Sequence, residues 1–378
     1  MVGIKRTQIK SDLQILRMGL IYTKLRDIQS YVRNWYHKRR LISTQRKECK
    51  DIIKTIPNCK VLSKDEEKEI QEYYSKRIGK KVSTMWHRLY TEGECGYSVD
   101  YVPLDILFSE IIPKLNISRF ADAYADKSRY EHLFPDIHHP KTIMKMVNGS
   151  IYIDDEIATL EKLWKSLPKE GSAILKPTLD TSRGDGVQVI NWCNIDSKDK
   201  LTKLLKDNSP NFIIQEKIDS HPLIKSLNPS SLNTLRIMTY RKDKEVYILS
   251  ITLKIGKCGE IVDNGHHGGY FCGVTKDGKL RKYIYTLDPF TKNTLTENGV
   301  RIEGKELPNF QKIQSIVKKC AERLPYARYI GWDIAIRHDG EPVLIEINIK
   351  GPGGNIMQIP NGPLFGEYRD IILEDIYG

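Results

Sequence analysis

Two alternating runs near the C-terminus, joined by a short polar segment, read Gly331-Trp332-Asp333-Ile334-Ala335-Ile336, His338-Asp339-Gly340-Glu341 and Leu344-Ile345-Glu346-Ile347-Asn348. An Asp-Gly pair between alternating apolar runs predicts a β-hairpin with a two-residue turn. With Asp339-Gly340 as that turn, Asp333 lies directly opposite Glu346, and Asn348 follows on the same face. The opposite face of this hairpin is then apolar and faces the core; it comprises Trp332, Ile334, Ile336, Val343, Ile345 and Ile347.

The two opposed carboxylates predict a metal site. Like charges directly opposite each other on a sheet are destabilising, and a divalent cation removes that conflict. The oxygen-only set of Asp333, Glu346 and Asn348, without His or Cys, suits Mg²⁺ or Mn²⁺ better than Zn²⁺. Protein-bound Mg²⁺ usually also contacts substrate phosphates, so we expect a nucleotide at the same place. The alternative is an exposed acidic face that points into water.

The composition is that of a globular protein with two or three subdomains. The chain has 378 residues, of which 40% are hydrophobic and 29% charged. It contains no apolar run of about 18 residues, and its basic N-terminus lacks the apolar core and cleavage site of a signal peptide. We therefore expect a cytoplasmic protein. The seven cysteines are scattered without a Cys-x-x-Cys pair, which predicts reduced, structural thiols.

The positive charge is concentrated at the N-terminus. Residues 1–60 contain fifteen Lys and Arg against four Asp and Glu, while the whole chain has a formal net charge of +12. Apolar residues from Leu13 to Trp35 recur at helical spacing, which predicts one or two basic amphipathic helices. Such helices bind anionic membrane surfaces or acidic polymers such as glycans. The alternative is a helix packed on the body with a solvated basic rim. Nucleic acid is disfavoured because no recognition motif accompanies the charge.

The pattern of elements predicts an α+β body. Ser63-Lys64-Asp65-Glu66 has the capping-box form and opens a helix to Ile78, which Gly79 ends. We expect an interrupted helix over 104–115, a strand over 151–153 and a helix over 156–167. Further strands are expected over 172–176, 186–191, 212–218, 234–241, 246–255, 329–337 and 342–349, with helices over 198–207 and 309–323. Antiparallel strands with inserted helices are typical of α+β proteins.

The segment after residue 172 has the form of a phosphate-binding loop. Ala173-Ile174-Leu175-Lys176-Pro177 reads as a strand that ends in a lysine, and a loop of small residues follows over 178–187. Backbone N–H groups of such a loop can wrap phosphates while the lysine supplies a positive charge. The sequence is neither a Walker A motif nor a dinucleotide fingerprint. An ordinary β-turn with a surface lysine is the alternative.

Several short blocks occur along residues 100–360 in a characteristic order. They are Asp126-Lys127, Ile174-Leu175-Lys176-Pro177, Gln215-Glu216, Ser231-Leu232-Asn233-Thr234-Leu235-Arg236, Val262-Asp263-Asn264, Gly268-Gly269, Gly331-Trp332-Asp333 and Glu346-Ile347-Asn348. In this order they resemble the ATP-grasp superfamily, most closely its sugar-transfer-associated or teichuronopeptide-biosynthesis-like branch. The resemblance implies an ATP-grasp fold, in which two α+β subdomains with antiparallel sheets clamp ATP. It divides the chain into a basic, mainly helical region (1–98), the N-terminal part of the ATP-grasp module (99–168) and a nucleotide- and metal-binding core (169–378).

The resemblance also implies roles for individual residues. Its nucleotide contacts would be Lys127, Lys176, Ser182, Arg183, Gly184, Gly186, Gln215, Glu216 and Ile218, and its metal ligands Asp333, Glu346 and Asn348. Its catalytic residues would be Arg236, Lys254 and Asn264. Arg236 and Lys254 lie within strands, where a charge is costly to bury unless it meets a partner or an anion, here the γ-phosphate or an acyl phosphate. Asn264 begins a glycine- and histidine-rich loop that would act as a lid.

The activity that this resemblance implies is an ATP- and Mg²⁺-dependent carboxylate–amine ligase that forms an acyl phosphate. By family context the carboxylate would belong to a uronic-acid-type sugar of a cell-surface polysaccharide, and the amine to an amino acid or other amine. Two alternatives stay open: an ATP-grasp kinase that phosphorylates a sugar hydroxyl, and a non-catalytic nucleotide-binding scaffold for glycan enzymes.

The basic segment 1–60 lies outside the resemblance. If it binds an anionic membrane surface, it would place the protein at the inner face of the membrane.

Overall fold

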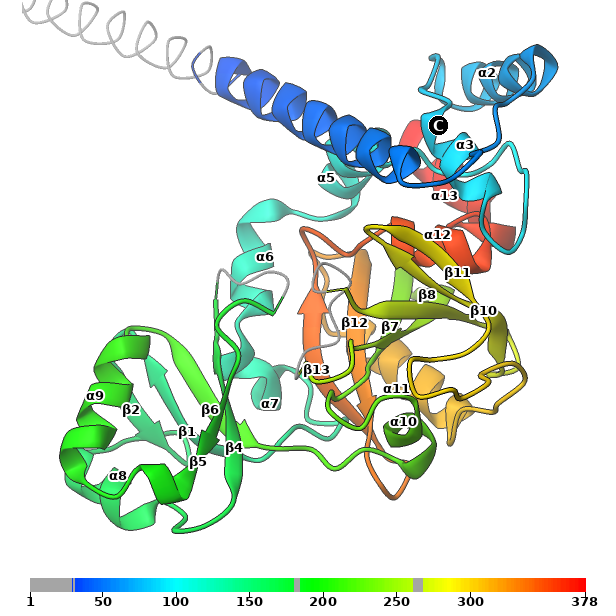
Figure 1. Cartoon of the computed structure of the whole chain (residues 1–378). Coiled ribbons are helices and arrows are strands. Elements are labelled where there is room, and N and C mark those ends of the chain that lie inside the picture. The colour runs from blue at the N-terminus through cyan, green and yellow to red at the C-terminus, as the bar shows by residue number, and fades with distance from the viewer. Residues whose placement is uncertain (1–28, 30, 180–183, 261–267) are drawn as a thin grey trace, which may run out of the picture.

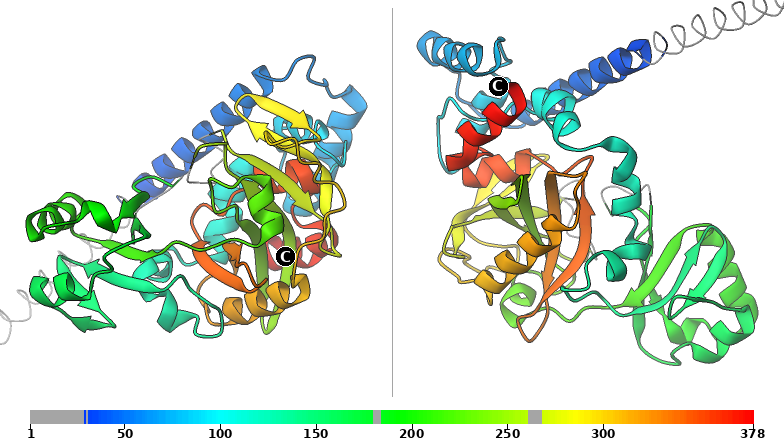
Figure 2. Two further views of the ribbon diagram at one scale, coloured as in Figure 1. Left: turned by 60° about the horizontal axis from the view of Figure 1, so that its bottom comes forward. Right: turned by 180° about the vertical axis from the view of Figure 1, so that it is seen from behind.

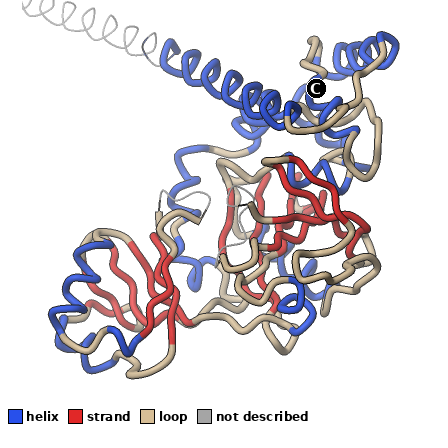
Figure 3. Tube along the Cα trace, in the orientation of Figure 1, coloured by secondary structure: helices blue, strands red, loops and turns tan. Residues whose placement is uncertain are grey.

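The structure is a computed structural model that describes residues 29, 31–179, 184–260 and 268–378. Two antiparallel sheets with flanking helices give a mixed α+β architecture, and N-terminal helices lie above the larger sheet (Figure 1). Figure 3 shows the strands gathered into two separate groups, with helices around and between them. The predicted α+β class is therefore confirmed. No helix in the described ranges is long and apolar enough to cross a membrane.

The smaller sheet has six strands in the order β3 (Glu156–Ile157), β2 (Ser150–Ile153), β1 (Thr142–Val147), β6 (Phe212–Glu216), β4 (Ser172–Pro177) and β5 (Gln188–Asn191). Helices α8 (Leu160–Ser166) and α9 (Lys198–Asn208) cover one face of it (Figure 1). Leu175 of β4 and Ile214 of β6 point to that face and pack in one apolar cluster with Leu163 and Leu201 of the two helices. Because side chains alternate along a strand, Ile174, Lys176 and Gln215 point to the other face.

The larger sheet has seven strands in the order β11 (Phe290–Asn293), β10 (Leu280–Leu287), β9 (Tyr270–Val274), β8 (Glu245–Ile255), β7 (Leu235–Lys242), β12 (Tyr329–Ile336) and β13 (Pro342–Asn348). Both of its faces are covered. Helices α10 (Pro222–Leu227) and α11 (Phe310–Glu322) pack with Ile237 and Trp332 on one face, as the view from behind in Figure 2 shows for α11. The other face carries Met238 and Tyr240, which belong to a second apolar cluster.

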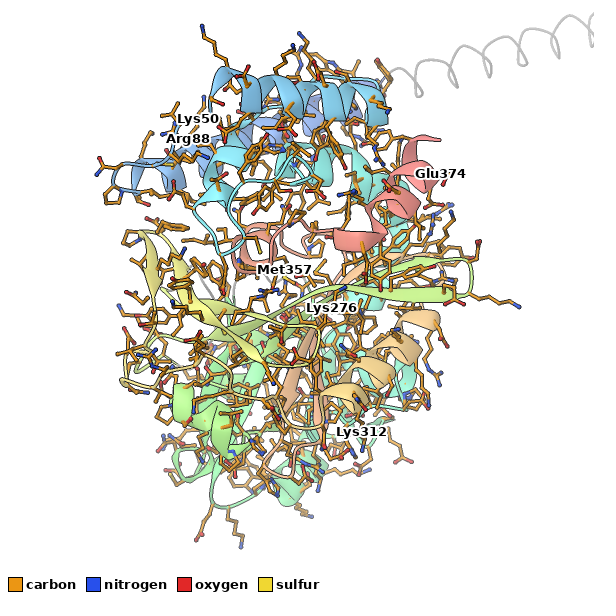
Figure 4. The ribbon with its side chains drawn as sticks, turned by 90° about the vertical axis from the view of Figure 1, so that its right-hand side faces the viewer. Lys50, Arg88, Lys276, Lys312, Met357 and Glu374 are labelled. Carbon is orange, nitrogen blue, oxygen red and sulfur yellow. The ribbon has the colours of Figure 1, made fainter. Side chains whose placement is uncertain are left out.

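That second cluster joins the C-terminal and N-terminal helices to the larger sheet. It contains buried residues of α12 (Asn355–Asn361) and α13 (Arg369–Tyr377), and of α2 (Lys64–Ile78) and α3 (Met85–Thr91). Figure 4 shows Met357 of α12 between the N-terminal helices above and the sheet below, and this side chain is fully buried. The capping box at Ser63 and the left-handed Gly79 that ends α2 are both present, as predicted.

The N-terminal helix over residues 31–54 has two different halves. Its C-terminal half packs on the body, where Cys49 and Ile52 are buried in the second cluster. Its N-terminal half extends away from the body (Figure 1), and Tyr31, Trp35 and Tyr36 are exposed there. Both expectations for this segment, a packed helix and an exposed basic amphipathic helix, thus apply to different parts of it. The predicted apolar positions before residue 29 lie outside the described residues.

The C-terminal hairpin has the predicted register at the end far from its turn, around Asp333 and Glu346, and a different register near the turn. Asp333 pairs with Glu346, and Trp332 with Ile347, as expected. The two-residue turn is wrong, because Arg337 and Glu341 still pair through the backbone and His338, Asp339 and Gly340 form the loop. The extra residue is absorbed by a β-bulge at Ile345, so that Leu344 rather than Ile345 lies opposite Ile334 in the core.

Several other boundaries differ from the predictions. Residues 156–157 form strand β3, so the helix that was expected from 156 begins only after the Thr159 cap. The helix over 104–115 is divided into α4 (Leu104–Ile106), a π-helix (Leu107–Ile111) and α5 (Ile112–Leu115), next to Pro113, whose missing N–H interrupts the ladder. The strands β1, β9, β10 and β11 were not predicted. The remaining helices are α6 (Ser118–Ala125), α7 (Tyr130–Leu133) and short 3-10 turns at Lys127–Arg129, Trp192–Asn194 and Gly366–Tyr368.

Candidate active site

One large cavity, of about 880 Å³, lies between the two sheets. From the smaller sheet it is lined by Ile174, Lys176 and Gln215, and from the larger sheet by side chains of β7, β8, β12 and β13. Nearly all the described residues that the sequence predicts as site residues line this cavity. They are Lys127, Lys176, Gly184, Gln215, Glu216, Ile218, Arg236, Lys254, Asp333, Glu346 and Asn348.

A row of charged side chains crosses the cavity face of the larger sheet. The ladder places Arg236 of β7 opposite Asp333 of β12, and Asp333 opposite Glu346 of β13. Lys254 of β8 joins the row from the neighbouring strand, with its Nζ 3.1 Å from Asp333 Oδ2. The sequence could place Asp333 opposite Glu346, but the contribution of β7 and β8 depends on strand order.

Asp333 is buried and surrounded by hydrogen-bond donors. Arg236 donates from Nε to Oδ1 at 2.6 Å and from Nη2 to Oδ2 at 3.0 Å, a two-pronged ion pair. Burial raises the pKa of Asp333, but the charges of Arg236 and Lys254 outweigh this effect and lower it to about 2. The protein's own cations therefore already neutralise this carboxylate, which the hairpin pattern alone did not reveal.

Arg236 is also held by the loop after β13, because its Nη1 donates to the Pro352 carbonyl oxygen at 2.5 Å. Gly331, beside Asp333, allows this close approach. A Cβ at Gly331 would lie 3.1 Å from the Pro352 oxygen and 3.2 Å from Arg236 Cδ. The predicted contact of Arg236 with a phosphate stays a prediction; in the structure its guanidinium fixes Asp333 and the 352 loop.

Glu346 and Asn348 complete the oxygen face. Glu346 is half-buried and forms an ion pair with Lys127 at 2.9 Å, and the Asn348 amide nitrogen lies 3.4 Å from Asp333 Oδ2. Among the described residues, no group of three or more His, Cys, Asp and Glu side chains is placed to hold a metal ion. The two carboxylates and the Asn348 oxygen fit Mg²⁺, which commonly takes one or two protein carboxylates and completes its shell with water and phosphate oxygens.

Lys176 faces the same space from the smaller sheet. It is buried, and within the described part of the chain no hydrogen bond or ion pair reaches its Nζ. Burial, together with the nearby charge of Lys127, lowers the pKa of Lys176 to about 8. Two lysines that converge beside a half-buried carboxylate form a cationic wall, which is suited to the phosphates of a nucleotide.

Gln215 marks the other end of the cavity. Its Nε2 donates to the Pro140 carbonyl oxygen at 3.1 Å and to Thr142 Oγ1 at 3.2 Å, which fixes the amide. Its Oε1 is buried and accepts no hydrogen bond from the residues that are described. Such an orphan acceptor is costly unless a ligand supplies a donor. The Glu216 carboxylate accepts a hydrogen bond from the Lys141 backbone N–H at 3.0 Å, and its predicted nucleotide contact stays a prediction.

The predicted phosphate loop is only partly described. Gly186 has a φ of +78°, and a Cβ there would lie 2.7 Å from Pro177 Cγ, so the loop's return onto β4 requires a glycine. Gly184 also adopts a positive φ and lines the cavity. Ser182, Arg183 and Asn264, which the sequence also predicts as site residues, lie outside the described residues.

Ile345 and Thr234 are two of the cavity residues that sequence reasoning missed. Ile345 occupies the bulge, which turns it from the predicted core face to the cavity. Thr234 precedes β7 and is buried against the cavity. No signal in the alternation pattern could have placed Ile345, whereas Thr234 lies within a block that had been singled out.

Comparisons with known proteins found one matching family and several similar solved structures. A family model described as "Sugar-transfer associated ATP-grasp" matches residues 108–370. No curated protein matches the sequence. Among solved structures, the ATP-grasp ligase PsnB complexed with a minimal precursor, Mg and ADP is 13% identical, with a TM-score of 0.41, and the alignment covers 69% of this chain and 62% of that one.

Two further solved structures show similar values. The VanG D-Ala:D-Ser ligase from Enterococcus faecalis is 14% identical, with a TM-score of 0.41 and coverage of 67% and 62%. The L-amino acid ligase from Bacillus licheniformis is 14% identical, with a TM-score of 0.36 and coverage of 69% and 49%. The chain spans less than two thirds of the length of these structures. The match of the family model over most of the sequence shows that the chain belongs to the sugar-transfer associated ATP-grasp family.

Proposed function

We propose that this protein is an ATP- and Mg²⁺-dependent carboxylate–amine ligase. The observation that carries the proposal is one cavity that joins three sets of groups from the two sheets. These are the orphan amide oxygen of Gln215, the buried cation Lys176 and the oxygen face of Asp333, Glu346 and Asn348. In this order they match adenine, phosphates and metal, and the membership of the chain in an ATP-grasp family supports the assignment.

The predicted site residues that follow would bind ATP and Mg²⁺. The Gln215 oxygen would accept a hydrogen bond from the adenine amino group, and Lys176 and Lys127 would contact phosphates. Glu346, Asp333 and the Asn348 oxygen would hold one or two Mg²⁺ ions, with Mn²⁺ as a substitute. When bound, Mg²⁺ supplies charge neutralisation at the β- and γ-phosphates. Ser182, Arg183 and Asn264 retain their predicted roles as proposals.

The chemistry would proceed in two displacement steps. A carboxylate oxygen of the first substrate attacks the γ-phosphorus of ATP, and ADP leaves, which gives an acyl phosphate. The amine nitrogen of the second substrate then attacks the carbonyl carbon, inorganic phosphate leaves, and the nitrogen loses a proton as the amide forms. Arg236 and Lys254 would stabilise the negative charge of the transferred group, so that catalysis is mainly positioning and charge neutralisation.

We infer further that the carboxylate belongs to a uronic-acid-type sugar of a cell-surface polysaccharide or its precursor, and the amine to an amino acid. The family's association with sugar transfer supports this inference. The test is ATP turnover with D-glucuronic or D-galacturonic acid, with hydroxylamine as a general amine. A ligase releases ADP and phosphate in equal amounts and forms a hydroxamate. A kinase forms ADP and a phosphorylated sugar without free phosphate, and a scaffold forms neither product.

The N-terminal helix supports a cytoplasmic protein that contacts the inner face of the membrane. Tyr31, Trp35 and Tyr36 are exposed on it, and the Arg39 guanidinium lies 4.1 Å from the centre of the Trp35 ring. Aromatic and basic residues together are typical of helices that lie on anionic lipid surfaces. Deletion of residues 1–60 would remove buried core residues, so a paired change of Trp35→Ser and Tyr36→Ser is the better test. We expect binding to anionic vesicles at low salt that this variant loses; equal sedimentation of both proteins would refute the contact.

A further inference from the structure

The N-terminal helix over residues 31–54 forms one wall of the cavity. Leu41, Gln45 and Glu48 line it. Their spacing of four and three residues places them on one face of the helix. The family model begins at residue 108, so this wall is built by a segment that lies outside the matched region. The cavity therefore has a wall that the matched region does not contain.

Several contacts hold this helix in a fixed position. Arg46 forms an ion pair at 2.7 Å with Asp105, whose side chain is buried at the start of α4. Thr55, just beyond the helix, accepts a hydrogen bond from the backbone N–H of Phe290 at 2.9 Å. The buried Cys49 and Ile52 pack in the cluster that covers the larger sheet. The wall is thus anchored within residues 41–48, at Arg46, and on their C-terminal side.

A set of contacts leads from the proposed metal face, which is formed by Asp333, Glu346 and Asn348, to this wall. Lys254, which pairs with Asp333, lies opposite Phe271 in the β8–β9 ladder. On the other side of Asp333, the loop after β13 approaches α4 so closely that a Cβ at Gly354 would lie 2.2 Å from Leu104 Cδ2. Asp105 follows Leu104 and holds Arg46 of the helix. The helix therefore joins the cavity on the side of Asp333 where α4 lies, whereas Gln215 belongs to β6 of the smaller sheet.

The chemistry of the cavity changes along this direction. Next to Asp333 are the cations Lys254 and Arg236. Farther on, the lining is apolar and includes Leu104, Phe108, Phe271 and Leu287. At the helix the lining becomes polar again with the Gln45 amide, a donor and acceptor, and the Glu48 carboxylate, an acceptor. A ligand that fits all three zones has a carboxylate at one end and hydrogen-bond donors at the other.

We propose that residues 41–48 form the distal end of the acceptor subsite. The subsite takes a small molecule whose carboxylate lies at Lys254 and Arg236 and whose hydroxyl or ammonium groups reach Gln45 and Glu48. This inference rests on the proposed function, because the carboxylate end is defined by the phosphate-transfer site. It goes beyond that function by assigning the recognition of the acceptor to a segment outside the family's matched region.

The position of the wall is tested with ATP that carries a benzophenone group on its γ-phosphate. After irradiation and trypsin digestion, we expect label within residues 41–50, and an excess of unmodified Mg-ATP should abolish it. Label confined to other parts of the cavity would overturn the inference and leave the nucleotide site intact. If neither ATP nor the probe binds, the proposed function itself fails and the inference falls with it.

The recognition chemistry is tested by ADP release with hydroxylamine and three probes: D-glucuronic acid, 6-aminohexanoic acid and hexanoic acid. We expect the half-saturating concentration of one of the two donor-bearing probes to be at least tenfold lower than that of hexanoic acid. Preference for D-glucuronic acid would indicate hydroxyl recognition, and preference for 6-aminohexanoic acid would indicate ammonium recognition. In Glu48→Gln, the ratio of the half-saturating concentrations of hexanoic acid and the preferred probe should fall at least threefold. If neither donor-bearing probe surpasses hexanoic acid, the assigned ligand class is wrong.

A blocking substitution separates the wall from the nucleotide site. Gln45→Trp should raise the half-saturating concentration of the preferred probe at least tenfold while the Kd for Mg-ATP stays within twofold. Lys47→Trp is the matched control, because Lys47 is exposed on the same helix and does not line the cavity. An unchanged half-saturating concentration in Gln45→Trp would refute the subsite, as would an equal change in Lys47→Trp.

Discussion

The two sides of the cavity differ in how far the protein satisfies its own polar groups. On the larger sheet, Asp333 receives three hydrogen bonds from Arg236 and Lys254. On the smaller sheet, Lys176 and the Gln215 oxygen are buried without a partner among the described residues. The difference indicates that the proposed metal face around Asp333 is organised before any ligand arrives, whereas the proposed nucleotide face around Lys176 would need a ligand to satisfy its buried polar groups. Substitutions on the two sides should therefore have different consequences.

The largest effect on stability is expected from Asp333→Asn. This change leaves Arg236 and Lys254 buried without a full negative charge, and breaking a buried ion pair typically costs about 3–5 kcal/mol in the free energy of unfolding. Urea denaturation measures the loss. Combining it with Arg236→Met should recover part of it. A loss below about 1 kcal/mol for the single variant would contradict the view that the metal face is held by its own ion pairs.

Lys176→Met should have the opposite pattern. It removes a buried positive charge, so the stability of the ligand-free protein should not fall, but the affinity for Mg-ATP should drop about ten- to hundredfold, as for loss of a hydrogen bond to a charged group. Calorimetry and urea denaturation give the two values. The exposed Lys165 on α8 is the control, since Lys165→Met should change neither. Equal ATP affinity in Lys176→Met would show that this lysine faces no phosphate.

The affinity for ATP should depend on pH through Lys176. Its pKa of about 8 in the folded protein means that the side chain is charged below pH 8 and loses its proton above it. Because phosphates favour the charged form, the Kd should be constant from pH 7 to 7.5 and then rise by up to about tenfold per pH unit above 8. In Lys176→Arg the rise should disappear. A wild-type Kd that does not change between pH 7 and 9 would contradict this assignment.

The smallest effect concerns Gln215. If its Oε1 accepts a hydrogen bond from the adenine amino group, Gln215→Met should weaken ATP binding about fivefold, because one neutral hydrogen bond contributes about 1 kcal/mol. Inosine triphosphate lacks this amino group, so its affinity should be unaffected by the change. An equal loss for both nucleotides would indicate a general disturbance of β6 instead.

The sequence predicted the hairpin because local alternation determines which residues share a face. It predicted the pairing of Asp333 with Glu346 but placed the turn one residue wrongly, since a period-two pattern cannot reveal the bulge at Ile345. It could not place Arg236 beside Asp333, because the adjacency of β7 and β12 arises from long-range strand order. The role of the helix over 31–54 as a cavity wall was equally inaccessible, since it depends on the ion pair of Arg46 with the buried Asp105, which is distant in the sequence.

The predicted roles of the site residues rest on a Mg²⁺-dependent ATP site. The most direct measurement is calorimetric binding of ATP, with and without Mg²⁺, to the wild type and to Glu346→Ala. Glu341→Ala is the matched control, because Glu341 lies at the other end of the same hairpin and pairs with Lys312. We predict binding that requires Mg²⁺, is lost in Glu346→Ala and is retained in Glu341→Ala. Failure of the wild type to bind ATP, or equal binding by Glu346→Ala with and without Mg²⁺, would contradict the account.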